Sequence, residues 1–132
     1  MRVALLQYSI AWADKETNLR MAEEHIAALA GKADVAVLPE MFATGFCTDH
    51  PELAETMDGE IIRRLQAVAD KSGVAIVSSF ICLPDPQHSI PDTPAKLRNR
   101  GFMIKPHAEI EIQDKRHLYA HGGEDLFFQP AQ

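Results

Sequence analysis

The sequence predicts an α/β fold with a largely parallel sheet, because short apolar runs alternate with segments of helical periodicity. Three runs have the length and composition of buried strands: Val3 to Gln7, Val35 to Leu38, and Val74 to Val77. A helical segment separates each run from the next. This βαβαβ order predicts strands that are mutually parallel, because each helix returns the chain across the sheet in the right-handed sense.

The two helical segments have one apolar face each and a clear stop signal. The first runs from Thr17 to Ala30, and Gly31 is expected to end it. The second begins near Asp58, the expected N-cap, and stops at Ser72-Gly73. The apolar faces consist of Leu19, Ala22, Ile26 and Leu29 in the first helix and of Ile61, Leu65 and Val68 in the second.

The second part of the chain has a different character. The prolines between Pro84 and Pro94 predict a long surface loop. Residues Arg100 to Lys105 and Glu109 to Gln113 then flank Pro106-His107-Ala108, which predicts a β-hairpin. Charged and apolar residues alternate in the second hairpin strand, so one of its faces is expected to meet water. The tail has no assignable period, and no domain boundary is visible within the 132 residues.

Composition and charge limit the class of protein. The chain is 46% hydrophobic and 24% charged, as expected of a globular domain. Its formal charge of -6 and its scattered basic residues argue against a nucleic-acid partner. No apolar run approaches the roughly 18 residues of a membrane span, and no signal peptide is visible. Two distant cysteines, Cys47 and Cys82, predict no disulfide framework and favour a cytoplasmic location.

Glu40 and Lys115 are the candidate catalytic residues. Glu40 follows the apolar run that ends in Leu38-Pro39, and ligands of open α/β sheets bind beyond the carboxyl ends of the strands. A carboxylate buried there among Met41-Phe42 is suited to act as a general base, whereas a solvated acid capping the strand is the alternative. Lys115 lies in a charged run that is either an exposed face or, if it turns inward, a source of positive charge for a developing oxyanion.

Three segments of the chain resemble a known family: LPEMFATGF around Glu40, NRGFMI from Asn99 to Ile104, and DKRHL from Asp114 to Leu118. They are similar to motifs of the nitrilase superfamily of carbon-nitrogen hydrolases, within it the omega-amidase-like branch, and the resemblance runs along the whole chain. It implies the N-terminal half of a four-layer α-β-β-α sandwich with a Glu-Lys-Cys triad. By this resemblance Glu40 matches the general base, Lys115 the cation that stabilises the tetrahedral intermediate, and Glu124 a second glutamate that helps to position the substrate.

The resemblance also implies a nucleophilic cysteine on a sharp turn a few tens of residues after the lysine. We therefore expect residues 1–132 to be a partial carbon-nitrogen hydrolase domain that ends before its nucleophile. Cys47 follows Glu40 by seven residues, but the sequence shows no electropositive setting that would activate its thiol. Cys82 follows a buried strand and is better explained as a small apolar side chain. Neither cysteine is expected to replace the missing nucleophile.

A zinc site is the other chemical interpretation of these residue types. Cys47-x-x-His50 and His117-x-x-x-His121 have finger-like spacing, and thiolate with imidazole suits zinc. Predicted helix, strand and hairpin elements separate the two pairs, so we expect the spacing to be a chance occurrence. The family resemblance implies neither a metal nor an organic cofactor.

The resemblance implies an amidase that releases ammonia from small omega-amides of dicarboxylic or 2-oxo acids, with a nitrile or a carbamoyl amine as the alternative substrate. It also implies a homo-oligomer when the enzyme is full length. This chain, without its nucleophile, is expected to be inactive. The alternative is a non-catalytic half-domain or gene remnant that pairs with another chain, since half of a sandwich exposes a sheet face and a sheet edge.

Overall fold

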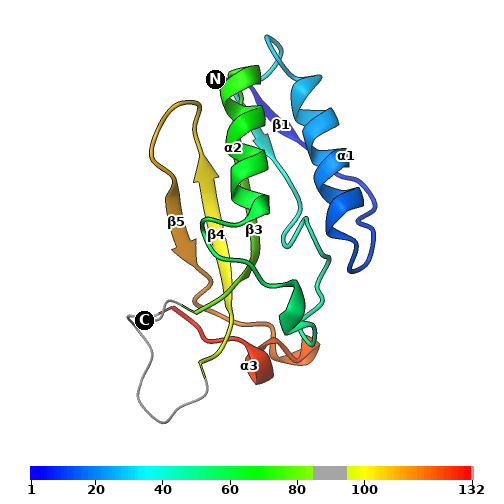
Figure 1. The fold of residues 1–132 in the computed structure, drawn as a ribbon, viewed down its shortest axis with the longest axis vertical. Coiled ribbons are helices and arrows are strands. Elements are labelled where there is room, and N and C mark those ends of the chain that lie inside the picture. The colour runs from blue at the N-terminus through cyan, green and yellow to red at the C-terminus, as the bar shows by residue number, and fades with distance from the viewer. Residues whose placement is uncertain (85–94, 132) are drawn as a thin grey trace.

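A computed structural model of the chain describes residues 1–84 and 95–131. Five strands form one sheet in the order β1-β2-β3-β4-β5 (Figure 1). The elements are β1 (Val3–Leu5), α1 (Lys15–Ala27), β2 (Val35–Val37), α2 (Glu60–Ser72), β3 (Ala75–Cys82), β4 (Arg98–Ile104), β5 (Glu111–Asp114) and α3 (Glu124–Phe127), with short 3-10 turns at Pro51–Leu53 and Ala120–Gly122.

The strand directions confirm the predicted order of elements. Strands β1, β2 and β3 are parallel neighbours, and β3, β4 and β5 are antiparallel. The third strand is longer than the predicted Val74 to Val77 because β4 pairs with it as far as Cys82. The predicted loop from Pro84 to Pro94 lies, apart from Pro84, outside the described residues.

Both long helices begin at residues that differ from the sequence prediction. Helix α1 starts at Lys15, two residues early, because Asp14 Oδ1 accepts the Thr17 backbone N–H at 3.1 Å. Helix α2 starts at Glu60, and its N-cap is Gly59, so the prediction of Asp58 as the cap is wrong. A carboxylate from the preceding loop takes over that role, since Glu55 Oε1 accepts the Ile61 backbone N–H at 2.8 Å.

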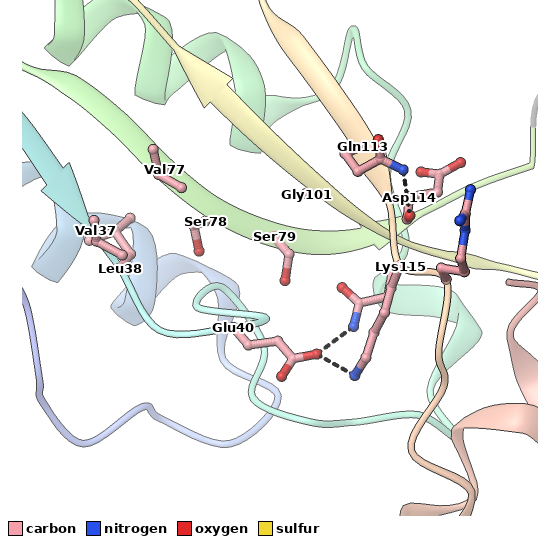
Figure 2. A pocket seen from close by; sticks show the side chains of 12 residues that line it. Val37, Leu38, Glu40, Val77, Ser78, Ser79, Gly101, Gln113, Asp114 and Lys115 are labelled. Atoms are coloured by element: carbon pink, nitrogen blue, oxygen red, sulfur yellow. Dashed lines mark hydrogen bonds and ion pairs between the residues drawn. The ribbon is translucent and has the colours of Figure 1, made fainter. Parts of the chain in front are cut away.

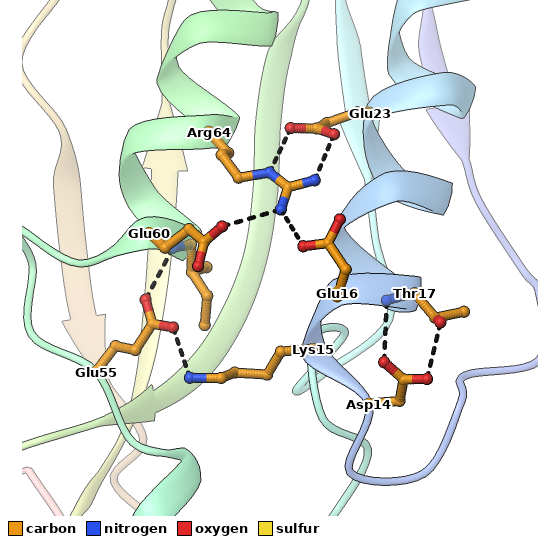
Figure 3. Close-up of polar contacts among 9 residues, drawn as sticks. Asp14, Lys15, Glu16, Thr17, Glu23, Glu55, Glu60 and Arg64 are labelled. Carbon is orange, nitrogen blue, oxygen red and sulfur yellow. Dashed lines mark hydrogen bonds and ion pairs between the residues drawn. The ribbon is translucent and has the colours of Figure 1, made fainter.

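The two long helices lie side by side on one face of the sheet (Figure 1). Figure 3 shows the polar contacts between them, in which Arg64 on α2 reaches Glu23 and Glu16 on α1 at 2.7 and 2.6 Å. Beneath these contacts the apolar helix faces pack on the sheet. The core includes Leu19, Ala22, Ile26, Ala36, Ile61, Leu65, Ile76, Phe80, Phe102 and Ile104.

The other face of the sheet is apolar and largely uncovered. Side chains alternate between the two faces of a strand, so the residues between core positions point away from the helices. Leu5, Val37, Val77 and Met103 pair with one another in register and form a row across four strands. Leu5 is 77% exposed, and the other three are only partly covered. This open apolar row is a surface that the helices do not protect.

The hairpin strand β5 is exposed on both of its faces, whereas the sequence predicted exposure of one. Ile112 lies on the same face as Phe102, its partner in β4, yet it is 49% exposed. The reason is its position at the sheet edge, where β4 is its only neighbouring strand among residues 1–84 and 95–131.

A second, smaller core ties the C-terminal residues to the sheet. It is formed by the buried side chains of Met41, Ile81, Leu97 and Phe128. Backbone hydrogen bonds from Leu97 N to Phe127 O and from Gln129 N to Leu97 O hold the tail beside β4. These contacts pack the C-terminal residues against the loop that carries Glu40.

Candidate active site

Glu40 lies three residues beyond the end of β2, and two serines of β3 hold the backbone on either side of it. Ser78 Oγ donates to the Pro39 carbonyl at 2.7 Å, and Ser79 Oγ accepts the Met41 N–H at 3.0 Å. Met41 is completely buried and has a φ of 49°, which a residue with a side chain rarely adopts. The surrounding contacts therefore fix a strained turn that presents the Glu40 side chain.

Lys115 comes directly after β5 and extends toward that turn. Its backbone N–H bonds to the Asn99 carbonyl at 2.9 Å, which continues the pairing of β4 with β5. Figure 2 shows the Glu40 and Lys115 side chains pointing toward one another, with Lys115 Nζ 2.8 Å from Glu40 Oε1. The structure brings together two residues that are 75 positions apart in the chain.

Glu124 is the third predicted site residue, and it also reaches Lys115. It is the first residue of α3, follows Gly123 at a φ of 73°, and is 0% exposed. Its Oε2 lies 3.1 Å from Lys115 Nζ and accepts the Tyr119 backbone N–H at 2.6 Å. A buried carboxylate needs such donors, because burial without them would be strongly unfavourable.

Asn99 is a site residue that the sequence reasoning did not identify. It lies on β4, is 2% exposed, and donates from Nδ2 to Glu40 Oε1 at 2.7 Å and to Glu124 Oε1 at 2.9 Å. The NRGFMI segment contained the signal. A polar amide in a strand whose neighbours pack against a core requires partners of its own.

Three of these residues, Glu40, Asn99 and Lys115, line an open pocket of about 690 Å³, and Glu124 is buried behind Lys115. Partial burial lowers the pKa of Lys115, but hydrogen bonds to Glu40 and Glu124 and the charges of these carboxylates raise it more, so the net change is upward. Lys115 Nζ also lies 5.4 Å from the centre of the Phe46 ring. The ammonium is therefore held in its charged form at neutral pH.

Glu40 is more exposed than expected. Its side chain is 48% exposed, which is closer to the solvated alternative than to the buried setting that the flanking apolar residues favoured. Met41 and Phe42 beside it are buried, but they turn into the two cores and away from the carboxylate. The pocket is open on this side.

The two cysteines are poor candidates for a nucleophile. Both are buried, and burial raises the pKa of each thiol. Cys47 Sγ lies 3.1 Å from the Thr44 carbonyl oxygen, and Cys82 packs in the main core. Because the thiolate is the reactive form, both side chains are in the wrong state for attack at neutral pH.

Within residues 1–84 and 95–131, no group of three or more histidine, cysteine, aspartate or glutamate side chains is placed to hold a metal ion. The same described residues include no helix that is both long enough and apolar enough to cross a membrane.

Comparison with known proteins places this geometry in context. A family profile described as carbon-nitrogen hydrolase matches residues 2–130. An omega-amidase, YafV, from Escherichia coli is 27% identical over 129 residues, which cover 98% of this chain and 46% of the relative. A 2-oxoglutaramate amidase from Bacillus subtilis is 29% identical, covering 96% of this chain and 50% of the relative. The chain thus spans about half the length of these relatives.

Solved structures share the fold. A CN-hydrolase superfamily protein from Xanthomonas campestris, with an arsenic adduct in its active site, has a TM-score of 0.87 and 29% identity and matches 99% of this chain but 46% of its own. An amidase from Nesterenkonia sp. has a TM-score of 0.76 at 23% identity, matching 100% of this chain and 48% of its own. The likeness to the Nesterenkonia protein concerns the fold alone.

Proposed function

The chain belongs to the carbon-nitrogen hydrolase family, and from this premise we propose that it supplies the acid-base half of an amidase site. The observation that supports this most is the convergence of Glu40 and Glu124 on the Lys115 ammonium, at 2.8 and 3.1 Å. Such an arrangement offers a proton acceptor beside a preorganised positive charge. Amide hydrolysis by a covalent route needs both.

In the proposed mechanism the nucleophile is a cysteine thiol outside residues 1–132. Glu40 accepts its proton, and the thiolate attacks the amide carbonyl. Lys115 stabilises the oxyanion of the tetrahedral intermediate, which collapses to a thioester as Glu40 returns its proton to the departing nitrogen and ammonia leaves. A water molecule that gives its proton to Glu40 then cleaves the thioester and frees the carboxylic acid. Glu124 helps to position the substrate.

The exposure of Glu40 agrees with a site in which this chain supplies the base and another segment supplies the thiol. Its Oε1 accepts hydrogen bonds from both Asn99 and Lys115, while none of the contacts among the described residues uses its Oε2. A free carboxylate oxygen at the mouth of the pocket is available to a thiol that approaches from another segment. Burial of Cys47 and Cys82 argues that the thiol is not one of these two.

The proposed substrates are small omega-amides that carry a carboxylate at the other end. Omega-amidase and 2-oxoglutaramate amidase relatives support this class. Arg116 also lines the pocket, and a guanidinium is well suited to bind a carboxylate.

The test uses a chimera in which this chain replaces the matching half of the Escherichia coli relative. We expect the chimera to release ammonia from 2-oxoglutaramate and to act poorly on butyramide, an amide of similar length without the carboxylate. Its Glu40→Gln variant should lose about 10²-fold or more of the rate, because the proton acceptor is gone. The chain alone should release none; vigorous turnover by the chain alone would contradict the proposed origin of the nucleophile.

A second candidate function is a non-catalytic half-domain that pairs with another chain. The open apolar row of Leu5, Val37, Val77 and Met103 favours it, since exposed apolar patches of this kind mark interaction surfaces. Size-exclusion chromatography of the purified chain tests it. A partner-dependent complex with an inactive chimera would favour the half-domain, whereas an active chimera would favour the amidase.

A further inference from the structure

Asn99 occupies a position from which its side chain contacts both carboxylates of the site. It lies near the start of β4, and its carbonyl accepts the backbone N–H of Lys115, so the two residues are neighbours where β4 and β5 diverge. Gly101, two residues along β4 and on the same face, also lines the pocket. The Asn99 side chain itself is 2% exposed.

The side-chain amide of Asn99 links the two carboxylates. Nδ2 has two hydrogens, and it lies 2.7 Å from Glu40 Oε1 and 2.9 Å from Glu124 Oε1. Its orientation follows from these partners, because turning the amide over would place its carbonyl oxygen against two carboxylate oxygens. Two carboxylates are thus bridged twice, once by this amide and once by the Lys115 ammonium.

The contacts divide the two oxygens of Glu40 into different roles. Oε1 accepts from Asn99 and Lys115, at 2.7 and 2.8 Å, and this pair of donors fixes the rotation of the carboxylate. Oε2 is left for a proton donor in the pocket. A lysine alone could not fix this rotation, because its flexible ammonium would follow the carboxylate.

We infer that Asn99 is a positioning residue that holds Glu40 and Glu124 apart at a fixed spacing and turns Oε2 of Glu40 toward the reacting thiol. The inference rests on the proposed amidase function for its effect on rate. The geometric part of the inference does not depend on that function, because Asn99, Glu40 and Glu124 all lie within the described part of this chain. The two parts are therefore tested separately.

The geometric part is tested by NMR on the 132-residue chain. Because each Asn99 amide proton is donated to a different carboxylate, we expect Glu40→Gln to shift mainly one proton of the pair and Glu124→Gln mainly the other. Gln66 is the matched control: its Nε2 also donates twice, to Asp70 and to the Lys105 carbonyl, at the turn where β4 ends. The chemical shifts of the Gln66 amide protons should not change in either variant. Unchanged Asn99 protons in both variants would overturn the inference.

The kinetic part uses the chimera. Replacing Asn99 with leucine keeps the side-chain size but removes both donors, and we expect kcat to fall roughly 10²-fold with little change in KM, because a misplaced base slows the chemical step. The control is Gln66→Leu, which should leave both constants unchanged. A rise in KM together with a fall in kcat and lost folding would reduce Asn99 to a structural residue, and that outcome would also overturn the inference.

A second variant separates positioning from packing by its pH profile. Asn99→Asp puts a third carboxyl beside Glu40, Glu124 and Lys115, in a pocket also lined by Asp114 and Arg116. When protonated, this carboxyl donates one hydrogen bond and so restores one of the two that the amide donates. We therefore expect the rate of Asn99→Asp, relative to the wild type, to rise as the pH falls, while the relative rate of Asn99→Leu stays flat. Parallel profiles for the two variants would refute a donor role. If Glu40→Gln leaves the rate of the chimera unchanged while the NMR result holds, the proposed function fails and the bridge remains.

Discussion

Replacing Lys115 with methionine is the most informative single change, because it removes the ammonium and keeps most of the apolar stem. The variant leaves Glu124, which is 0% exposed, without a cation. Breaking a buried ion pair in this way typically costs about 3 to 5 kcal/mol. Two donors remain on Glu124, Asn99 Nδ2 at 2.9 Å and Tyr119 N at 2.6 Å, so the lower limit applies. The ion pair between Lys115 and Glu40 adds little to the stability, since the Glu40 carboxylate is 48% exposed.

We therefore expect Lys115→Met to lower the free energy of unfolding by about 3 kcal/mol at pH 7, measured by urea denaturation of the purified chain. In a Glu124→Gln background the same change should cost less than about 1 kcal/mol, because the buried charge is already gone. Lys96→Met is the control: Lys96 is exposed and donates to the Asp125 carbonyl, and its loss should cost no more than about 0.5 kcal/mol.

The pH dependence supplies an independent check of this reasoning. The pKa of Lys115 is raised in the folded chain, so its contribution to stability is complete below the ordinary lysine value of about 10.4 and is lost as the pH rises through the raised value. The stability difference between the wild type and Lys115→Met should shrink in that alkaline range. A difference under about 1 kcal/mol at pH 7, or one equally large in the Glu124→Gln background, would refute the reasoning.

Three further changes test other parts of the structure. Tyr8→Phe should raise the free energy of unfolding by about 1 kcal/mol at pH 7, because the Tyr8 hydroxyl is buried without a partner among the described residues. A decrease in stability, measured by circular dichroism melts, would contradict this expectation. Burial raises the pKa of Tyr8 to about 12, so the wild type should also lose stability between about pH 10 and pH 12 in a way that the phenylalanine variant does not. Ser79→Ala should cost about 1 to 3 kcal/mol in urea unfolding, since the buried Met41 N–H loses its acceptor; no change would mean that this contact is dispensable. Changing Cys47 and Cys82 together to alanine should leave ammonia release by the chimera unchanged, and a lost activity in a folded variant would point to one of these thiols as the nucleophile.

Much of the fold follows from local sequence patterns. The three apolar runs and the two helical faces predicted the parallel βαβ units, because strand and helix periodicities differ in a way that residue spacing alone reveals. The starts of the helices were harder to predict. Asp58 resembles an N-cap, but the Glu55 carboxylate from an earlier turn accepts the Ile61 N–H, and such a contact depends on how the loop folds back.

The site was only partly predictable for the same reason. Glu40 was predicted because it follows a strand, and strand ends carry ligand-binding groups in α/β sheets. The orientation of Lys115 could not be chosen from its charged run, and its proposed role came from the family resemblance. Asn99 lies inside a strand, and nothing in its local sequence indicates which carboxylates its amide meets. The exposure of Glu40 was one of two alternatives, and Met41 and Phe42 favoured the buried one, whereas both of these side chains turn inward.

The anchoring of the tail has a practical consequence for labelling. Ala131 N–H bonds to the Lys115 carbonyl at 3.0 Å, and the Pro130 carbonyl accepts from Arg98 at 2.8 Å, so the last described residues are fastened beside the pocket. The amino terminus lies toward the opposite end of the molecule (Figure 1). A fluorophore joined to the C-terminal residues would thus act as a local reporter of pocket occupancy, while an affinity tag is best placed at residue 1.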